Sequence, residues 1–155
     1  MILTNPVEMR EAVAARVRLM GLDVGTKTIG LALSDTRRVI ASPLETIRRR
    51  RFREDMARLL ALIDTHDVGG LVIGLPLTLA GRDGPRTQSV RQLARNLIAL
   101  RDLPVAFWDE RLSTVAVTRE MIAGDLTRKR RGEIVDRVAA AYILQGFLDY
   151  LARTA

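Results

Sequence analysis

The stretch 18–35 constrains the fold more than any other part of the sequence, because two short apolar runs there flank a tight turn. The runs are 17–22 and 29–33, and the six residues between them include Gly25. Apolar runs of this length predict buried strands. So short a connection makes the two strands an antiparallel hairpin.

Asp23 falls at the end of the first predicted strand, beside the glycine-containing turn. A buried carboxylate costs free energy unless it is paired or holds a metal ion, so this position indicates a functional acid. The alternative is that Asp23 caps the turn through its own backbone. The stretch by itself leaves both interpretations open.

After the hairpin, the apolar pattern predicts a third strand followed by alternating helices and strands. The third strand, 39–47, contains Pro43, which indicates an edge strand or a bulge. We predict a mixed sheet flanked by helices, in one α/β domain over residues 16–155, with residues 1–15 as an N-terminal extension. The last helix is expected to turn Val135, Val138, Ala139, Tyr142 and Ile143 inward. The other predicted elements are a helix at 54–66, a strand at 70–76, a helix at 87–100, a strand at 105–108, a helix from Ser113 or Thr114 to 122, a basic loop at 124–132 and the last helix at 133–151.

The composition indicates a phosphate-rich partner. The formal net charge is +7, and all the basic residues except Lys27 and Lys129 and the single histidine are arginines, which bind phosphate bidentately. The alternative explanation of the many arginines is a compositional bias of the whole genome toward arginine. The absence of cysteine excludes disulfides, thiolate metal sites and cysteine nucleophiles. No apolar run approaches the roughly 18 residues of a membrane helix and no signal-peptide core precedes the domain, so a cytoplasmic protein is expected.

Four acids, Asp23, Asp109, Glu110 and Asp136, lie at the ends of predicted elements in apolar surroundings. Carboxylates without histidine or cysteine form an oxygen-only site of the kind that suits Mg²⁺ or Mn²⁺, and two such ions can promote phosphodiester hydrolysis. Each acid also has a simpler explanation. Asp136 can complement the dipole of the last helix in its first turn, and the Asp109 and Glu110 pair can lie in a solvated loop, paired with Arg111. Spacing leaves their convergence open.

Four blocks of the sequence, in order across about residues 18–151, resemble the YqgF family, whose members are also called Holliday junction resolvases or pre-16S rRNA nucleases and have a ribonuclease H-like fold. Each block is weak alone, and together they are specific. The blocks are Gly21-Leu22-Asp23-Val24-Gly25-Thr26 with Ile29-Gly30 and Ser34-Asp35; Val72-Ile73-Gly74-Leu75-Pro76 with Gly81; Asp109-Glu110-Arg111-Leu112-Ser113-Thr114; and Val135-Asp136 with Ala139-Ala140 and Ile143-Leu144-Gln145.

The resemblance implies that Asp23, Glu110 and Asp136 are the catalytic, metal-binding acids, and that three antiparallel strands precede two strands parallel to the first. Two positions depart from the family pattern. Thr28 stands where the family usually has arginine, and Thr78 stands where it often has asparagine.

The leading hypothesis is a metal-dependent nuclease that acts on structured nucleic acid, most of all on precursor 16S rRNA. The alternatives are a Holliday junction resolvase, a nucleic-acid-binding regulator without nuclease activity, and a phosphate-binding kinase or ATPase, for which the chain is too short. The apolar stripes of the predicted helices are all needed to cover the sheet, which leaves no apolar face for a stable dimer. A monomer or a weak dimer is therefore expected. The predicted nucleic-acid contacts are Lys27, Arg111, Arg128, Lys129, Arg130 and Arg131. The basic run 48–53 is a further candidate for holding the phosphate backbone.

Overall fold

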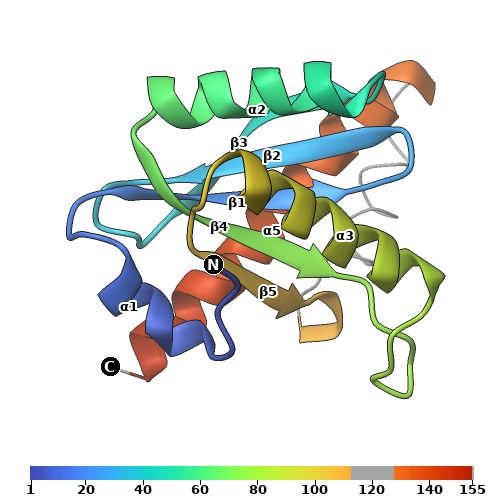
Figure 1. Cartoon of the computed structure of the whole chain (residues 1–155). Coiled ribbons are helices and arrows are strands. Elements are labelled where there is room, and N and C mark those ends of the chain that lie inside the picture. Colours follow the sequence, from blue (N-terminus) through green and yellow to red (C-terminus); the bar gives the residue numbers. More distant parts are fainter. Residues whose placement is uncertain (113–127, 155) are drawn as a thin grey trace.

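A mixed sheet of five strands, in the order β3-β2-β1-β4-β5, forms the centre of the described part of the chain (Figure 1). The computed structural model describes residues 1–112 and 128–154, with side chains described up to residue 112 and from residue 134 to 154. The strands are β1 (Arg18–Val24), β2 (Thr28–Ser34), β3 (Ala41–Arg48), β4 (Val68–Leu75) and β5 (Val105–Asp109).

The strand directions confirm the predicted topology. β1 pairs antiparallel with β2 and β2 antiparallel with β3, whereas β4 runs parallel to β1 and β5 runs parallel to β4. β3 is an edge strand, and its register with β2 shifts just before Ala32 pairs with Pro43, as predicted for that proline. The C-terminal ends of β1, β4 and β5 therefore lie at one edge of the sheet, together with the start of β2.

Helices cover both faces of the sheet. α2 (Phe52–Thr65) and α3 (Pro85–Leu100) pack on one face, and α5 (Arg128–Arg153) crosses the other (Figure 1). Because both faces are covered, the central strands are apolar at nearly every position rather than at alternate ones. No helix in the described part of the chain has both the length and the apolarity needed to cross a bilayer.

The N-terminal segment contacts the core on the α5 side. After the short helices η1 (Pro6–Glu8) and α1 (Met9–Ala12), Val13 is buried, and Leu3 and Met9 lie in the same apolar cluster. Ile2 pairs with Val105 in a parallel bridge, and the Leu3 amide donates to the Val105 carbonyl at 2.8 Å. The segment therefore covers the start of the edge strand β5.

Two sequence predictions about the last helix are wrong. The run Arg128, Lys129, Arg130 and Arg131 is the start of α5 and not a loop, because arginine and lysine favour helix strongly enough to carry it back across Gly132. Tyr142 is 42% exposed, because the buried stripe runs through Ala139, Ile143 and Phe147 and leaves position 142 at its margin. The helix expected to end at residue 122 lies outside the described residues.

Candidate active site

A pocket of about 310 Å³ brings Asp23, Glu110 and Asp136 together. It lies at the sheet edge where β1, β4 and β5 end, which is where open α/β sheets place their ligands. The three acids come from β1, from the turn after β5 and from α5, so only the folded chain assembles them. The other residues lining the pocket are Val24, Gly25, Thr26, Pro76 and Arg86.

Asp23 belongs to β1 itself, where it pairs with Gly30 of β2 and is only 5% exposed. The turn that follows is closed by the backbone, since the Gly25 amide donates to the Thr28 carbonyl at 2.8 Å. A carboxylate this deeply buried at a strand end is unusual, and it is the feature of the pocket that most strongly suggests a function.

Asp136 reaches the pocket because α5 passes unusually close to β2. A Cβ atom on Gly30 would lie 2.0 Å from the Asp136 carbonyl oxygen, so only glycine permits this approach. The Thr28 hydroxyl donates a hydrogen bond to the Asp136 carboxylate. Because α5 begins at Arg128, Asp136 is not in its first turn, and the explanation of this acid by the helix dipole is wrong.

Glu110 opens the short helix η2 (Glu110–Leu112) directly after β5. Its side chain packs over Gly74 of β4, where a Cβ atom would lie 2.8 Å from the Glu110 Oε1 atom and 2.5 Å from Ile143 Cδ1. Gly74 therefore leaves the space that the Glu110 carboxylate occupies between β4 and α5.

Asp109 and Arg111 form an ion pair beside the pocket, as the simpler explanation of Asp109 supposed. The Arg111 guanidinium donates to both Asp109 carboxylate oxygens, at 3.0 Å from Nε and 2.6 Å from Nη2, and this contact holds the pKa of Asp109 below its usual value. Arg111 also donates to the Leu79 carbonyl at 3.3 Å and lies against Gly81, whose φ is +76°. The guanidinium thus connects the end of β5 to the loop after β4.

Thr78, one of the two departures from the family pattern, stabilises that same loop. Its hydroxyl accepts a hydrogen bond from the Arg82 amide at 3.1 Å, and its carbonyl accepts one from the Gly81 amide at 2.8 Å. The side chain at this position therefore helps to shape the loop.

Two arginines lie beside the acids. Arg49 belongs to the basic run 48–53 that the sequence marks as a phosphate contact, whereas Arg86 is not among the predicted site residues. Arg86, near the start of α3, lines the pocket and donates to the Val24 carbonyl at 2.7 Å. Arg49, between β3 and α2, donates to the Gly25 carbonyl at 2.7 Å. A signal for Arg86 exists in the sequence, since the residue follows a loop that leaves the C-terminal end of a buried strand.

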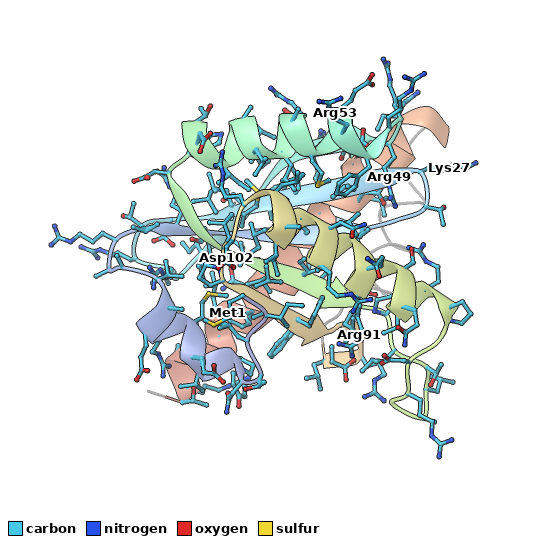
Figure 2. The ribbon with its side chains drawn as sticks, in the orientation of Figure 1. Met1, Lys27, Arg49, Arg53, Arg91 and Asp102 are labelled. Atoms are coloured by element: carbon cyan, nitrogen blue, oxygen red, sulfur yellow. The ribbon has the colours of Figure 1, made fainter. Side chains whose placement is uncertain are left out.

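Lys27 lies at the tip of the β1–β2 turn, exposed and directed away from the sheet (Figure 2). The side chains of Arg128, Lys129, Arg130 and Arg131 lie outside the described residues. The predicted contacts of these five residues with nucleic acid therefore stay predictions, as does that of Arg111.

The donor chemistry of the pocket fits a hard divalent cation, since its acidic groups are all carboxylates. The arrangement fits less well: in the described residues, no three histidine, cysteine, aspartate or glutamate side chains form a group that could hold one ion. The acids share a pocket and do not form a finished three-ligand site.

Thr28→Val tests how Asp136 is positioned. The substitution keeps the shape of the side chain and removes the hydroxyl that donates to Asp136, so we expect the free energy of unfolding to fall by about 0.5–1.5 kcal/mol. Thr28→Ser keeps the hydroxyl and is the matched control. Equal stabilities of the two variants in urea denaturation would show that the hydrogen bond contributes nothing.

Solved structures identify the fold of the chain. RuvC of T. thermophilus in complex with a Holliday junction substrate superposes with a TM-score of 0.53 at 15% identity, over 87% of this chain and 96% of that one. The yeast mitochondrial Holliday junction resolvase Ydc2 gives a TM-score of 0.50 at 13% identity, over 96% and 85%. The fold is ribonuclease H-like, as in these RuvC-type resolvases.

The family follows from sequence similarity. A family model described as "RuvX: Holliday junction resolvase" matches residues 17–150. A protein of Paramagnetospirillum magneticum is 57% identical over 149 residues, covering 96% of both chains, and one of Zymomonas mobilis is 56% identical over 154 residues, covering 97% and 94%. Both carry the name "Putative pre-16S rRNA nuclease". The chain belongs to the RuvX family, which confirms the YqgF resemblance.

Proposed function

We propose that the protein is a metal-dependent nuclease that hydrolyses phosphodiester bonds in structured RNA and processes the 5′ end of precursor 16S rRNA in the cytoplasm. The observation that carries this proposal is the pocket shared by Asp23, Glu110 and Asp136, at the C-terminal ends of strands β1, β4 and β5. The names of the relatives at 56–57% identity favour rRNA over other substrates.

In this proposal the three carboxylates would hold Mg²⁺ or Mn²⁺, in a two-metal-ion arrangement. Bound divalent ions would supply activation of a water molecule and stabilisation of the leaving oxygen. The chain's own contribution is to hold the acids: Thr28 orients Asp136, while Gly30 and Gly74 let α5 and Glu110 approach the sheet.

A junction resolvase is the second candidate, because the family model carries that description and RuvC shares the fold. Paired cuts in a four-way junction need two active sites related by two-fold symmetry. A single-strand processing enzyme needs only one, so the RNA proposal goes with a monomer or a weak dimer.

The test exposes purified protein to precursor 16S rRNA and to four-way DNA junctions, each with Mg²⁺, with Mn²⁺ or with EDTA. We expect divalent-ion-dependent cleavage near the 5′ end of the rRNA and little junction resolution. Symmetric paired cuts in the junction, with the rRNA left intact, would favour the second candidate. No cleavage of either substrate would favour a nucleic-acid-binding regulator.

Removing the positive charges of Arg128, Lys129, Arg130 and Arg131 should weaken RNA binding regardless of sequence, because phosphate contacts carry no sequence information. The slope of log affinity against log salt should flatten by about 0.7–0.9 for each lost contact. Removing the charges of Arg16 and Arg37, which are exposed at the opposite end of the sheet, is the control. Equal flattening per removed charge in both variants would mean that the run makes no specific contact.

A further inference from the structure

Arg86 and Arg49 hold the turn after Asp23 from two different elements. Arg86 of α3 donates to the Val24 carbonyl and Arg49, which follows β3, donates to the Gly25 carbonyl, both at 2.7 Å. These two carbonyls belong to consecutive residues. Both guanidinium groups therefore contact the turn that ends β1, directly after the buried Asp23.

Each of these arginines is held in position and uses only some of its hydrogen-bond donors. Both side chains are half-buried, and the amide of Arg49 donates to the Lys27 carbonyl at 2.8 Å. Among the described residues, each guanidinium makes a single hydrogen bond, although it carries five N–H donors. The bond to the turn fixes the position of the group, and the remaining donors are available to a ligand.

The charge of the pocket explains why a ligand with phosphate would need such a group. Three carboxylates line the pocket, and a phosphodiester that enters it is repelled by each of them. A guanidinium within the same lining offsets part of that repulsion and presents the planar donors that match phosphate oxygens. Because Arg86 is already held in place, little side-chain entropy is lost when it binds.

We propose that Arg86 binds the substrate phosphate that enters the acidic pocket, and that Arg49 binds a neighbouring phosphate across the β1–β2 turn. The inference rests on the proposed function and adds to it the path that the RNA substrate follows across the protein surface. From the pocket, the bound RNA strand passes over the β1–β2 turn toward Arg49. Lys27 and Arg53 of α2 lie on the same side of the molecule (Figure 2).

The test measures the binding of a labelled single-stranded RNA at several salt concentrations, without divalent ions so that no cleavage occurs. Arg86→Met removes the charge and keeps most of the apolar stem. We expect affinity to fall about 10-fold or more and the salt slope to flatten by about 0.7. Arg95→Met is the matched control: it removes the same charge from the same helix, at an exposed position outside the pocket, where the guanidinium donates a hydrogen bond to Gln92 at 2.9 Å.

A second substitution separates phosphate binding from support of the turn. Arg86→Lys keeps a positive charge and a donor for the Val24 carbonyl, so we expect thermal stability near that of the wild type and affinity between those of wild type and Arg86→Met. If Arg86→Met and Arg95→Met bind RNA equally, with equal slopes, Arg86 only supports the turn and the inference fails. If wild-type protein cleaves no RNA but the binding differences hold, the proposed function fails and the phosphate site stands.

Discussion

Asp23→Asn is expected to reduce cleavage of precursor rRNA at least about 10²–10³-fold while leaving the fold intact. Asparagine keeps the size of the side chain and removes the charge that would attract a divalent cation. Asp23 is 5% exposed and shares its pocket with Glu110 and Asp136. Because like charges in one site repel each other, the variant should be as stable as the wild type or more so. Single-turnover cleavage and thermal unfolding measure the two effects.

The matched control for this prediction is Asp67→Asn. Asp67 is exposed just before β4, at the end of that strand away from the pocket, and its φ of +55° is a conformation that asparagine also adopts. This variant should keep wild-type activity. Cleavage at the wild-type rate by Asp23→Asn would show that Asp23 is not part of the active site.

Gly30→Ala should have the largest effect on the structure. The new Cβ atom would lie 2.0 Å from the Asp136 carbonyl oxygen and 2.3 Å from its carbonyl carbon, so α5 must move away from β2. Overpacking of this kind costs about 1–3 kcal/mol or more. The displacement also moves the Asp136 carboxylate, so cleavage should fall along with the free energy of unfolding.

Gly84→Ala is the control for the glycine substitution. Its Cβ atom would meet only Thr78 Cγ2, at 3.5 Å, which is an ordinary contact, and its φ of −111° suits any residue. We expect the cost to stay below about 1 kcal/mol, mainly from the change of N-cap residue. Similar unfolding curves for the two variants would show that α5 does not depend on close contact at Gly30.

The strands were predictable from sequence because their signal is local. Unbroken apolar runs such as 70–76 mark strands covered on both faces, and Pro43 marked the edge strand. The start of α5 was less predictable, because apolar periodicity does not register a basic run that extends a helix. The side on which Tyr142 falls depends on small rotations of α5 over the sheet, which periodicity does not fix.

The candidate site was predictable only in part. Asp23 stood out because a strand end beside a tight turn is a local feature, and the family resemblance singled out Glu110 and Asp136. The arginines at 86 and 49 depend on contacts between distant elements, with carbonyls of the β1–β2 turn. The glycines at 30 and 74 matter only because a helix and a carboxylate pack against them, which no spacing reveals.

The central claim is that Asp23, Glu110 and Asp136 act as one unit in metal-dependent cleavage. Single-turnover cleavage of precursor 16S rRNA in Mg²⁺, compared among Asp23→Asn, Glu110→Gln, Asp136→Asn and the triple variant, tests it most directly. Groups that act as a unit are strongly non-additive, so each single variant should be nearly as slow as the triple variant. The account would be contradicted if the cleavage-rate losses of the three single variants multiplied to give the loss of the triple variant, or if any single variant kept full activity.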